Sequence, residues 1–214
     1  MVIRALPLLT GLAPLIGINL AYWIGASADV IPSCIPYIDG CTSISATGRY
    51  PPGDRLFRAV MLPQAVLLAG TWYFAVLWLR SMSPRSKAGT PALVCGLVGA
   101  LALIVYVSYL GSKEPIYELM RRFGIYFYFV GTVIGQMILT LALKPSRLRQ
   151  AMLTIVAVPW VLGLLNFAQK ALRADPDMME NTIEWVVSVF MQIWFLLLYI
   201  GWRKTNFDVS VRPG

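Results

Sequence analysis

The stretch that decides the fold is residues 183–202, IEWVVSVFMQIWFLLLYIGW, close to the C-terminal end of the sequence. Its one charged residue, Glu184, stands at its start, and nearly every other residue is apolar or aromatic. An α-helix of about 20 apolar residues is long enough to cross the roughly 30 Å hydrocarbon core of a bilayer. The stretch therefore predicts a transmembrane helix.

Five similar stretches precede it, and ionisable groups are almost missing from all of them. A backbone in hydrocarbon must satisfy its own hydrogen bonds, which favours helices. The sequence predicts an all-α polytopic membrane protein, one domain over residues 1–214 built as a bundle of six transmembrane helices. The expected spans are residues 6–25, 59–79, 92–110, 123–143, 152–168 and 183–202, with a long loop at 26–58.

The composition agrees with a chain that lies mostly in lipid. Hydrophobic residues make up 58% and charged residues 13%, whereas a soluble domain carries about a quarter charged residues. The net charge is +8, but the basic residues lie at the ends of apolar runs, as in loops that face anionic headgroups. Nucleic acid is therefore not an expected partner. The chain has no histidine, which excludes imidazole-activated nucleophiles and histidine-bound zinc, and no metal or cofactor is expected.

The first span has two interpretations. Arg4, an apolar run and Ala26-Ser27-Ala28 resemble a cleavable signal peptide. However, the apolar run is about 20 residues long, and the corresponding region of a signal peptide usually has about 7–15. We therefore expect a retained helix.

The basic residues also predict the orientation. With a cytoplasmic N-terminus, ten Lys and Arg lie inside and eight outside, a modest bias in the direction of the positive-inside rule. Both termini are then expected in the cytoplasm and the long loop on the outer side. The expected location is the Golgi, the ER or another endomembrane in a eukaryote, or the inner membrane in a bacterium.

Two of the three cysteines, Cys34 and Cys41, share the long loop. On the outer side they would meet an oxidising compartment, where disulfides persist. We expect a disulfide between them, with two free thiols as the alternative. Cys95 lies within the third span and is expected to act as a small packing residue.

Charged residues gather where the spans reach the outer surface. Asp54, Arg55 and Arg58 precede or open the second span, Arg121 and Arg122 open the fourth, and Glu184 opens the sixth. If these helices are neighbours, the residues form an electropositive pocket in which guanidinium groups hold a lipid phosphate.

Glu184 also begins a polar stripe, because Ser188 and Gln192 follow at i+4 and i+8 on the same helical face. If the protein is catalytic, Glu184 is the expected base, with Asp54 behind it. The residues expected to bind a lipid headgroup are Arg58, Arg122, Glu184, Arg55, Ser188 and Gln192.

Each of these residues also has a structural interpretation. Asn181 and Glu184 have the spacing of a helix capping box, and Glu118 can pair with Arg122 at i, i+4. Arg58 can simply extend to the headgroups. The sequence alone does not decide between these interpretations and a binding site.

Several short motifs resemble those of a known family. The outer loop reads SISATG at 43–48, followed by Pro51-Pro52 and Leu56-Phe57-Arg58, and the sixth span opens with Glu184-Trp185. The chain resembles the six-helix membrane family of the damage-regulated autophagy modulators (DRAM) and the post-GPI-attachment factor, and residues 101–143 look closest to the latter. The motif residues are Ser43, Ser45, Thr47, Gly48, Pro52, Phe57 and Trp185.

The resemblance implies work on membrane lipids, such as GPI-anchor-like remodelling or lipid distribution. Relatives similar to the GPI factor carry histidines where this chain has Arg122 and Gln136, so an imidazole-based acyl transfer is not carried over. Whether the chain is an enzyme stays open.

The alternative function is a non-catalytic scaffold or regulator. It would assemble a partner membrane protein, or a second copy of this chain, through Gly131 and Gly135 and the basic inner loops. A small transporter is less favoured, because no span carries a charge near its midpoint.

Overall fold

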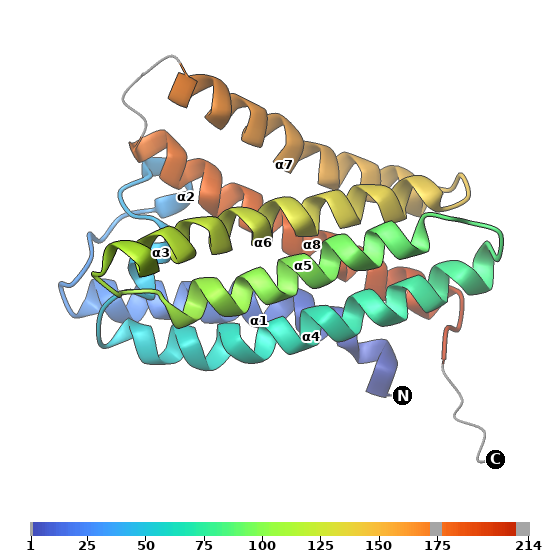
Figure 1. Cartoon of the computed structure of the whole chain (residues 1–214), viewed down its shortest axis with the longest axis horizontal. Helices are drawn as coiled ribbons and strands as arrows, with labels where there is room; N and C mark the ends of the chain where they lie inside the picture. Colours follow the sequence, from blue (N-terminus) through green and yellow to red (C-terminus); the bar gives the residue numbers. More distant parts are fainter. Residues whose placement is uncertain (1, 172–176, 209–214) are drawn as a thin grey trace.

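The computed structural model describes residues 2–171 and 177–208, and all elements in this part of the chain are α-helices (Figure 1). Two short helices, α2 (Pro36–Asp39) and α3 (Ile44–Thr47), lie in the connection between α1 and α4. The six long helices are all long and apolar enough to span a membrane, which confirms the predicted all-α bundle with six candidate spans. They are α1 (Val2–Ser27), α4 (Gly53–Met82), α5 (Gly89–Ser108), α6 (Pro115–Ala142), α7 (Arg147–Ala171) and α8 (Asp177–Lys204).

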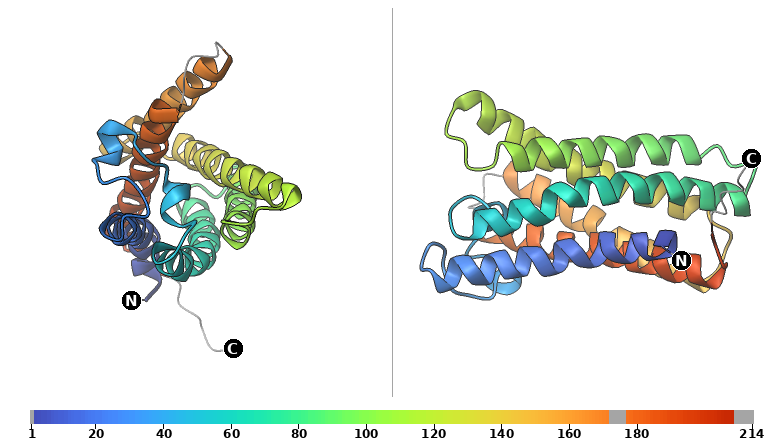
Figure 2. Two further views of the ribbon diagram at one scale, coloured as in Figure 1. Left: turned by 90° about the vertical axis from the view of Figure 1, so that its left-hand side faces the viewer. Right: turned by 90° about the horizontal axis from the view of Figure 1, so that it is seen from below.

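The long helices run alternately up and down, which gives the bundle two distinct ends (Figures 1 and 2). We call one the loop end, because it carries α2, α3 and the α5–α6 connection. The other is the terminal end, where α1 begins and α8 ends.

The helices extend beyond the predicted apolar spans. α4 begins at Gly53, inside the loop expected at 26–58, and α6 begins at Pro115 instead of near residue 123. Hydropathy detects only the part of a helix in hydrocarbon, whereas backbone hydrogen bonding continues into the polar interface. The charged residues expected to precede these spans therefore lie on the helices themselves.

Glycines bring α5 and α6 into close backbone contact. A Cβ at Gly131 would lie 2.8 Å from the carbonyl oxygen of Cys95, and one at Gly124 would lie 2.7 Å from the backbone nitrogen of Tyr106. A Cβ at Gly135 would approach the indole of α4 residue Trp72. The Gly131 and Gly135 pair thus packs inside the bundle, as small residues at this spacing usually do in membrane helices.

An aromatic cluster fills the middle of the bundle. Trp72 and Trp194 are fully buried and stack with ring centroids 5.8 Å apart, and Phe195 meets Trp72 edge-on at 6.1 Å. The indole nitrogen of Trp194 donates to Thr140 Oγ1 at 2.9 Å. A Cβ at Gly96 of α5 would collide with the Trp72 indole, so this contact also sets how closely α5 approaches α4. It joins four helices at one level.

The helix α1 is packed as part of the bundle. Thr10 Oγ1 and Thr71 Oγ1 lie 2.7 Å apart, and Gln64 Nε2 donates to the Thr10 carbonyl at 2.8 Å. A Cβ at Gly11 would reach 2.8 Å from the Leu196 side chain of α8. These contacts pack α1 against α4 and α8.

The helix α7 is the least covered span. Only 17% of its most apolar stretch is buried, against 39–50% for the other five spans. It packs on α8 and α6 near the terminal end and diverges from α6 toward the loop end (Figure 1). The rest of the described chain therefore leaves most of its side chains uncovered.

Arginines close the ends of helices to which they do not belong. Arg149 of α7 donates to the carbonyls of Thr140 and Leu141 at the end of α6, at 3.3 and 3.4 Å. Arg4 of α1 donates to Asn206 and Phe207 just after α8, at 3.2 and 2.8 Å. The last carbonyls of a helix have no partner within it, so the contacts of Arg149 satisfy groups that lipid would leave unpaired, while Arg4 ties α1 to the turn after α8.

We expect Gly96→Ala to lower the free energy of unfolding by about 1–3 kcal/mol, the usual cost of overpacking a core. The added methyl group would collide with Trp72, which cannot move away because Trp194 and Phe195 hold it. Thermal unfolding of the detergent-solubilised protein, followed by tryptophan fluorescence, measures the change.

Gly163→Ala is the matched control, because a Cβ at this position of α7 would have nothing within 4 Å. Its melting temperature is expected to stay the same or rise slightly, since alanine favours a helix over glycine. Equal losses in the two variants would contradict the packing described.

Candidate functional site

The first turns of α8 hold the connection between α1 and α4. Asn181 Nδ2 donates to the Gly40 carbonyl at 2.8 Å, and the indole nitrogen of the buried Trp185 donates to the Thr42 carbonyl at 2.9 Å. Because α8 already begins at Asp177, Asn181 is not its N-cap, and the capping-box interpretation is wrong. Asn181 serves the loop instead.

Glu184 lies on the same part of α8 and faces the start of α3. Its carboxyl group interacts with the backbone of Ile44 and Ser45 in the first turn of α3. Ser43 Oγ accepts the third N–H, that of Ala46, at 3.1 Å. The first N–H groups of a helix have no partner within it and attract negative charge. Glu184 is thus engaged in holding α3 against α8.

A disulfide closes the loop around α2. Cys34 and Cys41 are bonded, with Cα atoms 6.6 Å apart, which confirms the expected pair. The hydroxyl of Tyr22 donates to the Cys34 carbonyl at 2.7 Å and accepts from its N–H at 2.8 Å. Tyr37 of α2 contacts Trp185 with ring centroids 5.0 Å apart, and burial raises the pKa of its phenol. The loop is therefore tied to both α1 and α8.

The motif residues build the layer that covers the bundle at the loop end. Ser45 Oγ lies 2.9 Å from the hydroxyl of Tyr106, and Thr47 Oγ1 donates to the Ile44 carbonyl at 2.7 Å. A Cβ at Gly48 would collide with the buried ring of Phe57. Pro52, after a cis Pro51–Pro52 bond, precedes the first residue of α4. These contacts give the motif residues a structural role.

Arg58 does not approach Glu184 in a shared pocket. Its Nη1 donates to the Val107 and Ser108 carbonyls at 3.0 and 3.4 Å, and its Nη2 donates to the Leu110 carbonyl. Arg58 therefore closes the C-terminal end of α5, in the same way as Arg149 closes α6.

Arg122 also has a partner of its own, away from Glu184. Its side chain is 68% exposed and forms the i, i+4 ion pair with Glu118 at 2.9 Å. Arg55 is exposed, and Asp54 lies in the first turn of α4. The expected cluster of Arg58, Arg122 and Glu184 is thus not formed, because each has a structural partner of its own.

The polar stripe below Glu184 faces the bundle interior. Ser188 Oγ donates to the Trp185 carbonyl at 2.8 Å, and Gln192 Nε2 lies 3.4 Å from the hydroxyl of Tyr128. Both residues are buried, as expected for polar groups at membrane depth. The stripe is therefore part of the core and not of the outer surface.

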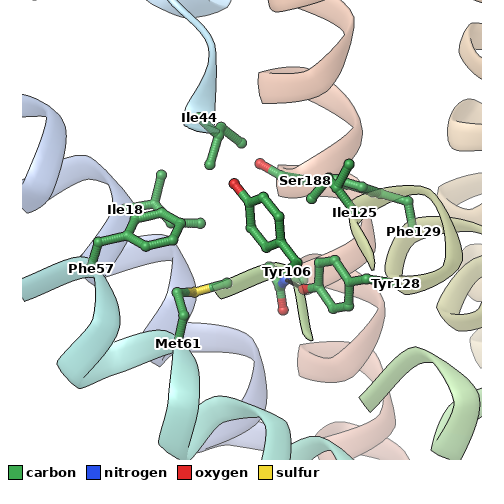
Figure 3. A pocket seen from close by; sticks show the side chains of 10 residues that line it. Ile18, Ile44, Phe57, Met61, Tyr106, Ile125, Tyr128, Phe129 and Ser188 are labelled. Atoms are coloured by element: carbon green, nitrogen blue, oxygen red, sulfur yellow. Dashed lines mark hydrogen bonds between the residues drawn. The ribbon is translucent and has the colours of Figure 1, made fainter. Parts of the chain in front are cut away.

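Ser188 and Gln192 line a small cavity between the helices (Figure 3). The Tyr106 ring stands in its centre with its hydroxyl directed toward Ile44 and Ser188, while Phe57 and Met61 close one side. The cavity has a volume of about 10 Å³, room for about one water molecule. A lipid headgroup does not fit there, so a headgroup site in this conformation must lie on the surface above it.

Two other arginines, Arg49 and Arg121, lie within electrostatic range of Tyr106. Their charges act on each other and on the Tyr106 hydroxyl, and the charge of Arg49 also acts on Glu184. Arg121 is only 16% exposed and lies 3.6 Å from Glu118. The Nε atoms of Arg49 and Arg121 are buried and have no hydrogen-bond partner among the described residues. The loop end therefore carries two partly buried guanidinium groups in place of the expected pair.

A local pattern in the sequence indicates that Arg121, and not Arg122, faces the bundle interior. Arg121, Gly124, Tyr128 and Thr132 recur at i, i+3, i+7 and i+11, so they share one face of α6, and the last three are buried. Arg122 stands about 100° further round the helix and faces outward. Arg49 directly follows the SISATG motif at 43–48, but nothing local indicates that it lies near α6.

No family model, no curated protein and no solved structure matches the chain. The resemblance to the DRAM and GPI-factor family therefore stays an expectation. Within residues 2–171 and 177–208, no three His, Cys, Asp or Glu come together as metal ligands.

We expect Arg58→Gln to lower the free energy of unfolding by about 1.5–3 kcal/mol, the usual contribution of hydrogen bonds to a charged group. The reason is that the carbonyls at the end of α5 lose their donors. The melting temperature in detergent measures this loss. Arg55→Gln, on the same helix but exposed, is the control and is expected to change it little. A stable Arg58→Gln variant that loses bound lipid would contradict the capping role.

Proposed function

We propose that this protein binds the phosphate of a phospholipid or glycolipid headgroup at the loop end, through Arg49 and Arg121. The proposal rests on one observation. Both guanidinium groups are partly buried at the loop end, and each has an Nε–H without a hydrogen-bond partner among the described residues. A site of this kind favours an anion with several acceptor oxygens.

Electrostatics supports a phosphate in particular. Two guanidinium groups in range of each other repel, and each is costly to bury without a counter-charge. Glu118 offsets part of this charge, but it is shared between Arg121 and Arg122. A phosphate carries negative charge and presents acceptors in the geometry that guanidinium forks match, so it offsets the repulsion and pairs the free N–H groups.

Exposed aromatic rings elsewhere on α6 also suit a lipid. Phe123 and Phe127 are each 52% exposed, with ring centroids 6.2 Å apart, and they lie on the outward face of α6, on the side of the helix away from Arg121. Such a surface suits acyl chains, while the headgroup stays with the arginines at the level of the interface. A free phosphate would gain nothing from these rings.

We propose binding as the primary activity, in lipid remodelling or lipid distribution as the family resemblance implies. Glu184, the expected base, interacts with the backbone at the start of α3, and in this proposal it positions that helix. In this proposal the loop end faces the outer or lumenal side and both termini are cytoplasmic.

The scaffold alternative has one observation in its favour. Gly131 and Gly135 are occupied within the bundle, but α7 leaves most of its surface uncovered. A partner membrane protein would therefore use α7. The scaffold alternative predicts that a stoichiometric partner co-purifies with the chain. Binding of that partner would not depend on Arg49 or Arg121.

We expect Arg49→Gln and Arg121→Gln each to reduce the affinity for phospholipid about tenfold or more, because each removes charged hydrogen bonds to the phosphate. Native mass spectrometry of the full chain, extracted gently from its membrane, measures the retained lipid. Titration of the delipidated protein with a short-chain phospholipid gives the affinity.

Arg122→Gln is the matched control, since it removes the same charge from the next residue and shares the ion-pair partner Glu118. It is expected to keep lipid binding within about twofold of the original chain, as rim charges usually contribute little. If all three variants lose lipid equally, or none does, the proposed site is wrong.

A further inference from the structure

A second charged feature lies at the opposite end of the bundle. On the last two turns of α8, Tyr199, Ile200, Arg203 and Lys204 line an open hollow of about 330 Å³. The spacing i, i+1, i+4 and i+5 places these residues on one face of the helix. This hollow is independent of Arg49 and Arg121, which lie at the loop end.

The hollow combines positive charge with an apolar wall. Ile200 is 39% exposed, and the guanidinium of Arg203 lies 5.9 Å from the centroid of the Tyr199 ring. A cation over an aromatic face is favourable and orients the guanidinium group. Neither Arg203 nor Lys204 forms an ion pair with an acid among the described residues.

The charge around the hollow is one-sided. In the described part of the chain, the only acid at the terminal end is Asp208, which lies 3.5 Å from Arg4. Basic residues at this end are numerous: Arg4, Arg80, Arg85, Lys87, Lys144, Arg147, Arg149, Arg203 and Lys204. Most of them are spread along loops or cap helices, and only Arg203 and Lys204 border the hollow.

We propose that this hollow binds the headgroup of an anionic phospholipid from the leaflet at the terminal end. Arg203 and Lys204 contact the headgroup phosphate, and the start of the acyl chains packs against Ile200. The end of a transmembrane helix lies at the level of the headgroups, where a basic side chain attracts anionic lipid with a contribution that adds per residue. The apolar wall selects a lipid over a free anion.

The test uses the full chain in nanodiscs of phosphatidylcholine with a small fraction of phosphatidylglycerol. Native mass spectrometry counts the bound phosphatidylglycerol. The variants are Arg203→Gln and Lys204→Gln, singly and together. The double variant is expected to reduce the apparent affinity for phosphatidylglycerol about tenfold or more, and each single variant a few-fold. The single variants keep the test decisive if the double variant folds poorly.

The control is Arg85→Gln with Lys87→Gln, which removes the same two charges from exposed positions at the same end. It is expected to leave the binding of phosphatidylglycerol unchanged. An equal loss in this control would overturn the proposal, because it would mean diffuse attraction by net charge. Binding of inorganic phosphate in nanodiscs of pure phosphatidylcholine, with the same affinity as phosphatidylglycerol, would also overturn the proposal. It would mean that the site does not require a lipid.

Discussion

Backbone groups at the ends of membrane helices need hydrogen-bond partners that lipid does not provide, and this constraint governs where the polar side chains of the bundle go. Arg58 and Arg149 reach across to the ends of α5 and α6, and Arg4 reaches the turn after α8. Glu184 does the complementary task at the start of α3. Each contact ties together segments far apart in the sequence, so that the same bonds that satisfy the backbone also hold the bundle together.

This constraint separates the arginines into two groups. Those that close helix ends have their donors directed at carbonyls and are structural. Arg49 and Arg121 have buried donors that remain unpaired in the described part of the chain, which is costly unless another molecule accepts from them. The hydrogen-bond partners of an arginine therefore show whether it holds a helix end, which its depth in the bundle alone does not.

Close packing of glycines determines where this pair lies. Gly124 allows the backbone of α6 to meet that of α5 at Tyr106, and Arg121 stands one turn earlier on the same face of α6. The hydroxyl of Tyr106 in turn lies 2.9 Å from Ser45, which fixes α3 and the residues that follow it. The position of the two guanidinium groups thus follows from a contact between two backbones that a single Cβ would prevent.

The sequence by itself determined the six spans and the disulfide between Cys34 and Cys41. These features depend on length, hydropathy and local spacing, which a linear chain records directly. Only the tertiary structure decided the partners of the charged residues. Arg58 bonds a carbonyl 49 residues away, and Glu184 serves a helix near the other end of the sequence. Such partners depend on which helices are neighbours and on how closely their backbones approach, and no local pattern encodes either.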